Sequence, residues 1–143
     1  MNIVETEYWC LMLPPEWSAE QDDDVIRIFD QDDIGELALT TLVREPDAGA
    51  ASLPAQLAAE ESPEVTVWSD ASFGSFSGVT GGFEEDDAVV REWYLSHDPV
   101  LLYITYVCDK EDAGMDDAAV DEILGTLVAG DAISDEQAVA VTE

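Results

Sequence analysis

The chain has 143 residues, of which 47% are hydrophobic, and this length and composition are typical of one globular domain rather than of a disordered segment. Thirty-four aspartates and glutamates stand against four basic residues, which gives a net charge of −30. Such a surface repels the phosphates of DNA, RNA and anionic lipids, so the charge argues against direct binding to nucleic acid or to a membrane.

The first part of the chain predicts mostly β structure. Strands are expected at 4–13, 25–29 and 34–44, with Trp17 in a loop and acidic turns at 20–24 and 30–33. The first strand is stopped by Pro14 and Pro15, because proline cannot donate to a β ladder. The strand at 34–44 is apolar on both faces, so both faces are expected to be covered.

The middle of the chain predicts one helix between strands. Ser52 can cap a helix that runs to about residue 61 and ends before Pro63. A strand is expected at 64–73, and the glycine-rich segment 74–82 predicts a strand with a bulge or a sharp bend.

Two strong β runs then follow, at 88–95 and 100–108. They are separated by the four turn-forming residues 96–99, and this arrangement predicts a β hairpin. The run at 100–108 is apolar on both faces, which places it in the middle of a sheet that is covered on both sides.

A second helix is predicted at about 115–128. Its apolar residues recur at helical spacing, and Gly130 follows as a stop signal. The apolar stripe comprises Val120, Ile123, Leu124 and Leu127. Residues 129–143 are acidic and small, so a flexible tail is expected there, after a single domain at 1–128.

Location and redox state can also be predicted. The N-terminus lacks a basic segment followed by a long apolar one, and no apolar run reaches about 18 residues, so we expect a cytoplasmic protein. Cys10 and Cys108 lie far apart in predicted strands beside apolar neighbours. Two reduced, buried thiols are therefore expected.

The order of elements predicts an α+β fold with a central, mostly antiparallel sheet and helices packed on it. The segments "LPPEW" (13–17), "IGELALTTLVRE" (34–45), "FGSFSGVTGGF" (73–83), "VVREWYL" (89–95), "LLYITYVC" (101–108) and "AVDEILGTL" (119–127) follow one another in a familiar order. This pattern resembles the Mog1/PsbP-like superfamily, including bacterial members of the DcrB type. The resemblance covers roughly residues 8 to 128 when strands and helices are matched.

The resemblance implies an α/β/α sandwich with a central antiparallel sheet. It also implies a role that is mostly non-enzymatic, since relatives bind a small GTPase, attach to a photosystem or act as chaperones for type VI secretion effectors. The resemblance assigns no functional residue to this chain.

Motifs for catalysis or metal binding are incomplete. The acidic turn 30–35 resembles a calcium loop but has Ile34 at the fifth position and Thr41 at the twelfth, where ligands are required. The segment 74–78 has Phe76 where a nucleophile elbow needs serine. We therefore assign no catalytic, metal or cofactor-binding residue and expect no cofactor.

A small set of residues is singled out for partner binding. The aromatic residues Trp68, Phe73, Phe76 and Phe83 surround the glycine-rich segment, and any that are exposed would form a docking surface rimmed by acid. Arg91 is a ligand contact in one interpretation. In the other it is a structural arginine, stacked on Trp93 and paired with a carboxylate.

The acidity leaves two explanations open. One is a salt-adapted housekeeping domain, whose self-repulsion is screened in a salty cytoplasm. The other is a chaperone-like, adaptor or immunity-like module that binds a basic or amphipathic protein and is steered by charge. An enzyme with an unrecognised site is a third hypothesis, and a homodimer is compatible with the sequence.

Overall fold

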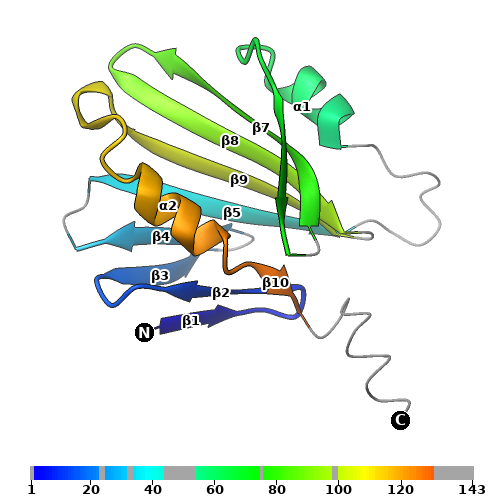
Figure 1. The fold of residues 1–143 in the computed structure, drawn as a ribbon, viewed down its shortest axis with the longest axis vertical. Coiled ribbons are helices and arrows are strands. Elements are labelled where there is room, and N and C mark those ends of the chain that lie inside the picture. Colours follow the sequence, from blue (N-terminus) through cyan, green and yellow to red (C-terminus); the bar gives the residue numbers. More distant parts are fainter. Residues whose placement is uncertain are drawn as a thin grey trace.

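The computed structural model describes residues 2–22, 25–31, 34–43, 54–74, 76–97 and 100–130, with side chains for all of them except 2 and 54–57. Within these residues most of the chain forms two antiparallel sheets (Figure 1). The α+β class and the antiparallel sheet expected from the sequence are confirmed. The predicted tail from 131 onward lies outside the described residues, and residues 129 and 130 lie inside them.

The large sheet has seven strands in the order β3-β4-β5-β9-β8-β7-β6, and every neighbouring pair is antiparallel. Its strands are β3 (Trp17–Asp22), β4 (Val25–Asp30), β5 (Gly35–Val43), β6 (Ser69–Phe73), β7 (Phe76–Glu85), β8 (Ala88–His97) and β9 (Val100–Asp109). The predicted hairpin is confirmed as β8 and β9. As its two-sided apolar pattern predicts, β9 occupies the middle of the sheet.

A small sheet is formed by β1 (Asn2–Glu5), β2 (Trp9–Leu13) and β10 (Val128–Ala129), with β2 in the centre. The single strand expected at 4–13 is thus wrong, because the chain turns at Thr6. The Thr6 hydroxyl accepts hydrogen bonds from the backbone N–H groups of Tyr8 and Trp9, at 3.2 and 3.0 Å. Threonine stabilises turns in this way, and a turn here makes a hairpin of β1 and β2.

The structure differs from the prediction at two further points, a predicted loop that is a strand and part of a predicted strand that is irregular. Trp17 begins β3 rather than lying in a loop, because Pro14 and Pro15 form a tight turn closed by a 3.0 Å bond from the Trp17 N–H to the Pro14 carbonyl. The acids of β3 suggested a turn but lie on an exposed edge strand. Residues 64–68 are irregular, so β6 begins only at Ser69.

Alternate side chains of β9 point to the two opposite faces of the large sheet. Leu102, Ile104 and Tyr106 point to the first face, where they pack in one core with the small sheet and α2 (Asp117–Leu124). The predicted stripe of Val120, Ile123, Leu124 and Leu127 is fully buried in this core. Helix α2 is shorter than predicted because the chain leaves it at Gly125 and continues into β10.

On the second face, α1 (Pro54–Glu61) packs against β7 and β8. A short 3-10 helix, η1 (Lys110–Asp112), follows β9. Strands supply much of the cover on the first face, so the structure is richer in sheet than the expected sandwich (Figure 1). The cysteines are not joined by a disulfide; Cys108 is buried and Cys10 half-buried.

Candidate functional site

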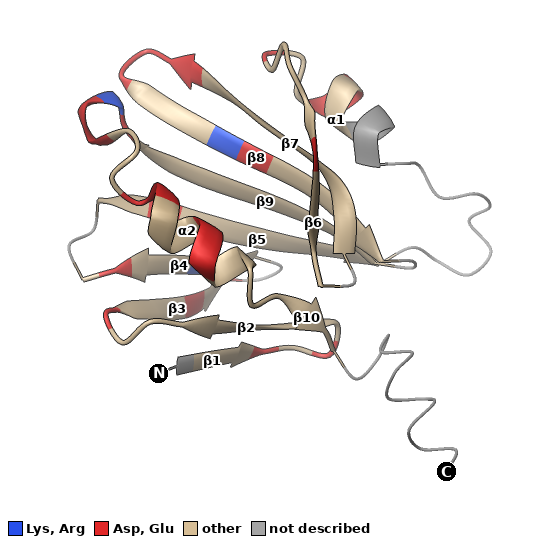
Figure 2. Cartoon of the chain, viewed as in Figure 1, with Lys and Arg blue, Asp and Glu red and all other residues tan. Residues whose placement is uncertain are grey.

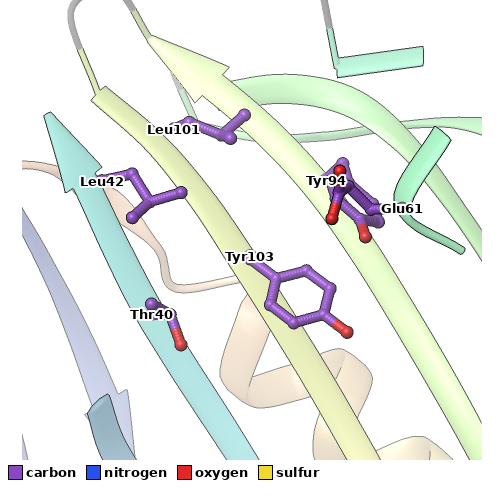
Figure 3. Close-up of a pocket in the computed structure, with 6 residues that line it drawn as sticks. All are labelled: Thr40, Leu42, Glu61, Tyr94, Leu101 and Tyr103. Atoms are coloured by element: carbon purple, nitrogen blue, oxygen red, sulfur yellow. The ribbon is translucent and has the colours of Figure 1, made fainter. Parts of the chain in front are cut away.

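A pocket of about 300 Å³ lies on the second face beside α1. Its lining comes from three strands of the large sheet and from the end of α1 (Figure 3). The lining residues are Thr40 and Leu42 of β5, Leu101 and Tyr103 of β9, Tyr94 of β8 and Glu61 of α1. The pocket therefore combines aliphatic, aromatic and acidic groups in one place.

The two tyrosines meet because of the strand register. Tyr94 and Tyr103 are direct cross-strand partners in the β8–β9 hairpin, and their ring centroids lie 4.8 Å apart at an interplanar angle of 46°. Trp68 packs edge-on against Tyr94, with ring centroids 5.8 Å apart. Aromatic pairs of this geometry stabilise a sheet beyond the area that they bury, so these contacts stabilise the aromatic side of the pocket.

Hydrogen bonds hold both tyrosine hydroxyls. The Tyr94 hydroxyl shares a 2.8 Å bond with the buried Ser62 hydroxyl, and Ser62 is tied to the end of α1 by a bond from its N–H to the Ala58 carbonyl. The Tyr103 hydroxyl donates to Glu92 Oε2 at 2.5 Å. The end of α1 and the hairpin thus fix the two rings together.

Glu92 is a buried acid behind these tyrosines. Its side chain is 5% exposed, and its second carboxylate oxygen, Oε1, is buried without a hydrogen-bond partner within the described structure. A buried carboxylate with an unsatisfied oxygen costs stability, because water no longer solvates it. Its negative charge also acts on its surroundings.

The pKa values of both tyrosines are raised. For Tyr103 the main cause is burial, followed by the hydrogen bond to Glu92 and the Glu92 charge. For Tyr94 burial again dominates; the charges of Glu92 and Glu61 add to it, and the Ser62 hydrogen bond opposes it. The two phenols are therefore neutral at physiological pH, and Tyr103 keeps the proton that it donates to Glu92.

The residues singled out from the sequence do not form one surface. Phe76 is fully buried on the first face, with its ring 5.7 Å from that of His97, and Phe73 packs against the same core. Phe83 is half-buried and by its register lies on the second face. Of these four aromatic residues, Trp68 is the one that adjoins the pocket, through Tyr94.

Arg91 lies on the first face, where it joins β8 to α2. Its guanidinium lies 4.7 Å from the centre of the Trp93 ring and pairs with Asp117 at 3.2 Å and Asp121 at 3.1 Å. These are the contacts expected of a structural arginine.

The described basic side chains are all engaged by acids. Arg27 pairs with Asp22 at 3.3 Å and with Glu36 at 3.9 Å, and Lys110 pairs with Glu84 at 3.1 Å. Figure 2 shows acids on both helices and at several strand ends, and basic and acidic positions side by side in the middle of β8. The remaining exposed charge is therefore acidic.

Two other kinds of site are absent from the part of the chain that the structure describes. No group of three His, Cys, Asp or Glu side chains is placed to hold a metal ion. No helix in this part of the chain has the length and apolar character needed to cross a bilayer.

Three solved structures share the fold at low sequence identity. A chain from Bacteroides thetaiotaomicron VPI-5482 matches with a TM-score of 0.64 and 14% identity, over 89% of this chain. Cyanobacterial PsbP (CyanoP) from Synechocystis sp. PCC 6803 matches with a TM-score of 0.62 and 8% identity, over 88% of this chain and 90% of its own length. LpqN of Mycobacterium tuberculosis, described as involved in cell envelope biogenesis, matches with a TM-score of 0.60 and 17% identity, over 85% of this chain and 83% of its own length.

These similarities establish the fold, and the Mog1/PsbP-like fold expected from the sequence is confirmed. The chain spans 47% of the Bacteroides chain that it matches. No protein-family model matches the sequence, and no curated protein matches it significantly.

Proposed function

We propose that the chain is a non-enzymatic binding module of the cytoplasm, which holds a basic, amphipathic protein segment on the second face of its large sheet. The observation that carries the proposal is the combination of partly exposed apolar side chains on this face with acids around them. A segment with cationic and apolar sides would complement both features.

The apolar part of the second face extends beyond the pocket. The apolar side chains of β4, β5 and β9 on this face are half-buried or exposed, and Leu42 and Val107 retain 50% and 41% of their exposure. The set comprises Val25, Phe29, Ala38, Leu42, Leu101, Tyr103 and Val107. A row of apolar side chains rimmed by polar groups is typical of an interaction surface.

The acids favour a cationic occupant over the chain's own C-terminal segment. Glu20 and Asp22 lie at one edge of the apolar row, Glu36 lies within it and Glu61 lies at its other edge. Arg27 of the same face pairs with Asp22 and Glu36, so Glu20 and Glu61 are the acids of this set that it does not engage. Residues 131–143 carry four acids and no base. Like charges juxtaposed across an interface cost free energy, whereas opposite charges also accelerate encounter.

The proposal predicts binding of a defined probe, a synthetic amphipathic helix with leucine on one side and lysine on the other. We expect amide chemical shifts in NMR to change along β5 and β9, and affinity to fall as salt rises. A matched helix with glutamate in place of lysine should not bind. Shift changes confined to other surfaces, or no binding of the lysine helix at low ionic strength, would refute the proposal.

Two variants test the location. Leu42→Asn should weaken binding of the lysine helix about tenfold, because a buried leucine contributes about 1.5–3 kcal/mol. Val128→Asn is the control, since Val128 is equally exposed but lies in the small sheet. Equal effects of the two changes would argue against the second face. Tighter binding by a chain that ends at Gly130 would instead identify residues 131–143 as its occupant.

A further inference from the structure

We infer that the tyrosine-lined pocket is the subsite for one arginine side chain of the bound segment. This inference rests on the proposed function and names the chemical group that the pocket recognises. The volume of the pocket suits a single side chain. At about 300 Å³ the pocket is at the lower end of the range for small-molecule sites, and it suits one long side chain better than a larger ligand.

The lining matches the two parts of an arginine. Leu42 and Leu101 offer aliphatic contact for the methylene stem, which amphipathic side chains bury against apolar surface. Figure 3 shows the Tyr103 ring face-on over the sheet, with Leu101 further along the same strand. A planar guanidinium stacks on such a face within about 6 Å of the ring centre.

Acids supply the charge complement. Glu61 lines the pocket next to Tyr94, and its carboxylate can accept two parallel hydrogen bonds from a guanidinium. Glu92 lies behind Tyr103, with one oxygen bonded to the phenol and the other without a partner in the described structure. Its buried charge is poorly screened by solvent, so it adds to the attraction for a cation in the pocket.

The first face contains a filled arrangement of the same kind. There the guanidinium of Arg91 lies over Trp93 and pairs with two carboxylates, Asp117 and Asp121. The pocket on the second face offers the same two elements, an aromatic face and a carboxylate. The described basic side chains are engaged elsewhere, so a cation from a partner would complete it.

The test compares three short peptides of alternating leucine and serine whose central residue is arginine, lysine or citrulline. Citrulline keeps the shape of arginine without its charge. We expect calorimetry at low ionic strength to give about tenfold tighter binding for arginine than for citrulline, with lysine between them. Glu61→Gln should remove most of this difference. Glu122→Gln, which makes the same charge change on α2, should preserve it.

Two further variants isolate the ring of Tyr103. Tyr103→Phe and Tyr103→Leu both lose the hydrogen bond to Glu92, so they share its effect on folding. The phenylalanine variant keeps an aromatic face and should retain the preference for arginine over citrulline, whereas the leucine variant should lose it. Equal preferences in the two variants would overturn the stacking argument.

The outcomes separate this inference from the proposed function. Equal binding of the arginine and citrulline peptides to the second face would overturn the arginine subsite and leave the docking face intact. Absence of all three peptides from that face, together with failure of the lysine helix, would overturn both. Arg44 follows β5 in the sequence, so tighter peptide binding by Arg44→Ala would show that the chain supplies its own arginine, which would also overturn the inference.

Discussion

Two tyrosines of β9 hold buried acids on opposite faces of the sheet. Tyr103 donates to Glu92 on the second face, and Tyr106 donates to Asp116 on the first, each at 2.5 Å. Tyr106 and Asp116 are both buried. The phenol of Tyr106 lies over Gly35 of β5, where a Cβ would overlap it. Both pairs make the protonated phenol part of the folded state.

The Tyr106 pair predicts a loss of stability at alkaline pH. Burial, the Asp116 hydrogen bond and the Asp116 charge raise the pKa of Tyr106 above its ordinary value of about 10. The folded state therefore holds this proton more tightly than the unfolded state. The stabilisation is complete below pH 10 and is lost as pH rises further.

Urea unfolding between pH 8 and about pH 11 measures this loss. We expect the free energy of unfolding to fall above pH 10, and less steeply in Tyr106→Phe. At neutral pH this variant should be about 1–3 kcal/mol less stable, because Asp116 loses its phenol donor. An unchanged alkaline slope in the variant would contradict the assignment to Tyr106, since Tyr94 and Tyr103 would then carry it.

Elements with a strong period could be predicted from the sequence, whereas the pocket could not. The apolar stripe of α2 recurs at helical spacing, and the two runs of the hairpin are rich in β-forming residues, so each pattern indicates its element. The pocket depends on the register of that hairpin. A four-residue turn at 96–99 would pair residue 95 with Val100, whereas the structure pairs His97 with Val100 and so places Tyr94 opposite Tyr103.

The part of the site that comes from the end of α1 could not be predicted from the sequence either. Glu61 and Ser62 approach the hairpin because α1 folds back onto β7 and β8, a long-range contact that has no local sequence signal. Glu92 gave a weak signal, as an acid within an otherwise β-rich run. The sequence did not indicate which aromatic residues of the set are exposed, and alternation in β7 puts Phe76 and Phe83 on opposite faces.

One substitution in the core-facing side of α2 is expected to lower the stability of the fold strongly. Leu124 is fully buried in the core between the large sheet and the small one. Leu124→Ala should lower the free energy of unfolding by about 2–5 kcal/mol, since it removes buried methyl groups and leaves a cavity. Glu122→Ala on the exposed side of the same helix is the control and should change stability by about 0.5 kcal/mol or less.

Urea denaturation of the two α2 variants makes the comparison. A loss below about 1 kcal/mol for Leu124→Ala would mean that α2 is not part of the cooperative core. The two variants also separate stability from binding. Neither residue lies on the second face, so peptide affinity should be unchanged in both as long as they are folded.

At the scale of the whole molecule, the charge and the core oppose each other. The net charge of −30 repels itself, and the range of this repulsion is about 30 Å at 0.01 M salt and 3 Å at 1 M. The opposing force is a continuous core that includes Trp9, Trp93 and Ile123 and joins both sheets to α2. The acids lie mainly outside this core, so salt acts on the surface.

We therefore expect a cooperative thermal transition already in dilute buffer, and a rise of about 4 °C or more in 1 M salt, which corresponds to about 1 kcal/mol for a chain of this size. Sodium chloride and sodium sulfate at equal ionic strength separate screening from the exclusion of sulfate by the surface. A transition that exists only in molar salt would favour a salt-adapted domain. In that case the acids would keep the protein hydrated at high salt, and they would give no support to the binding of a basic segment on the second face.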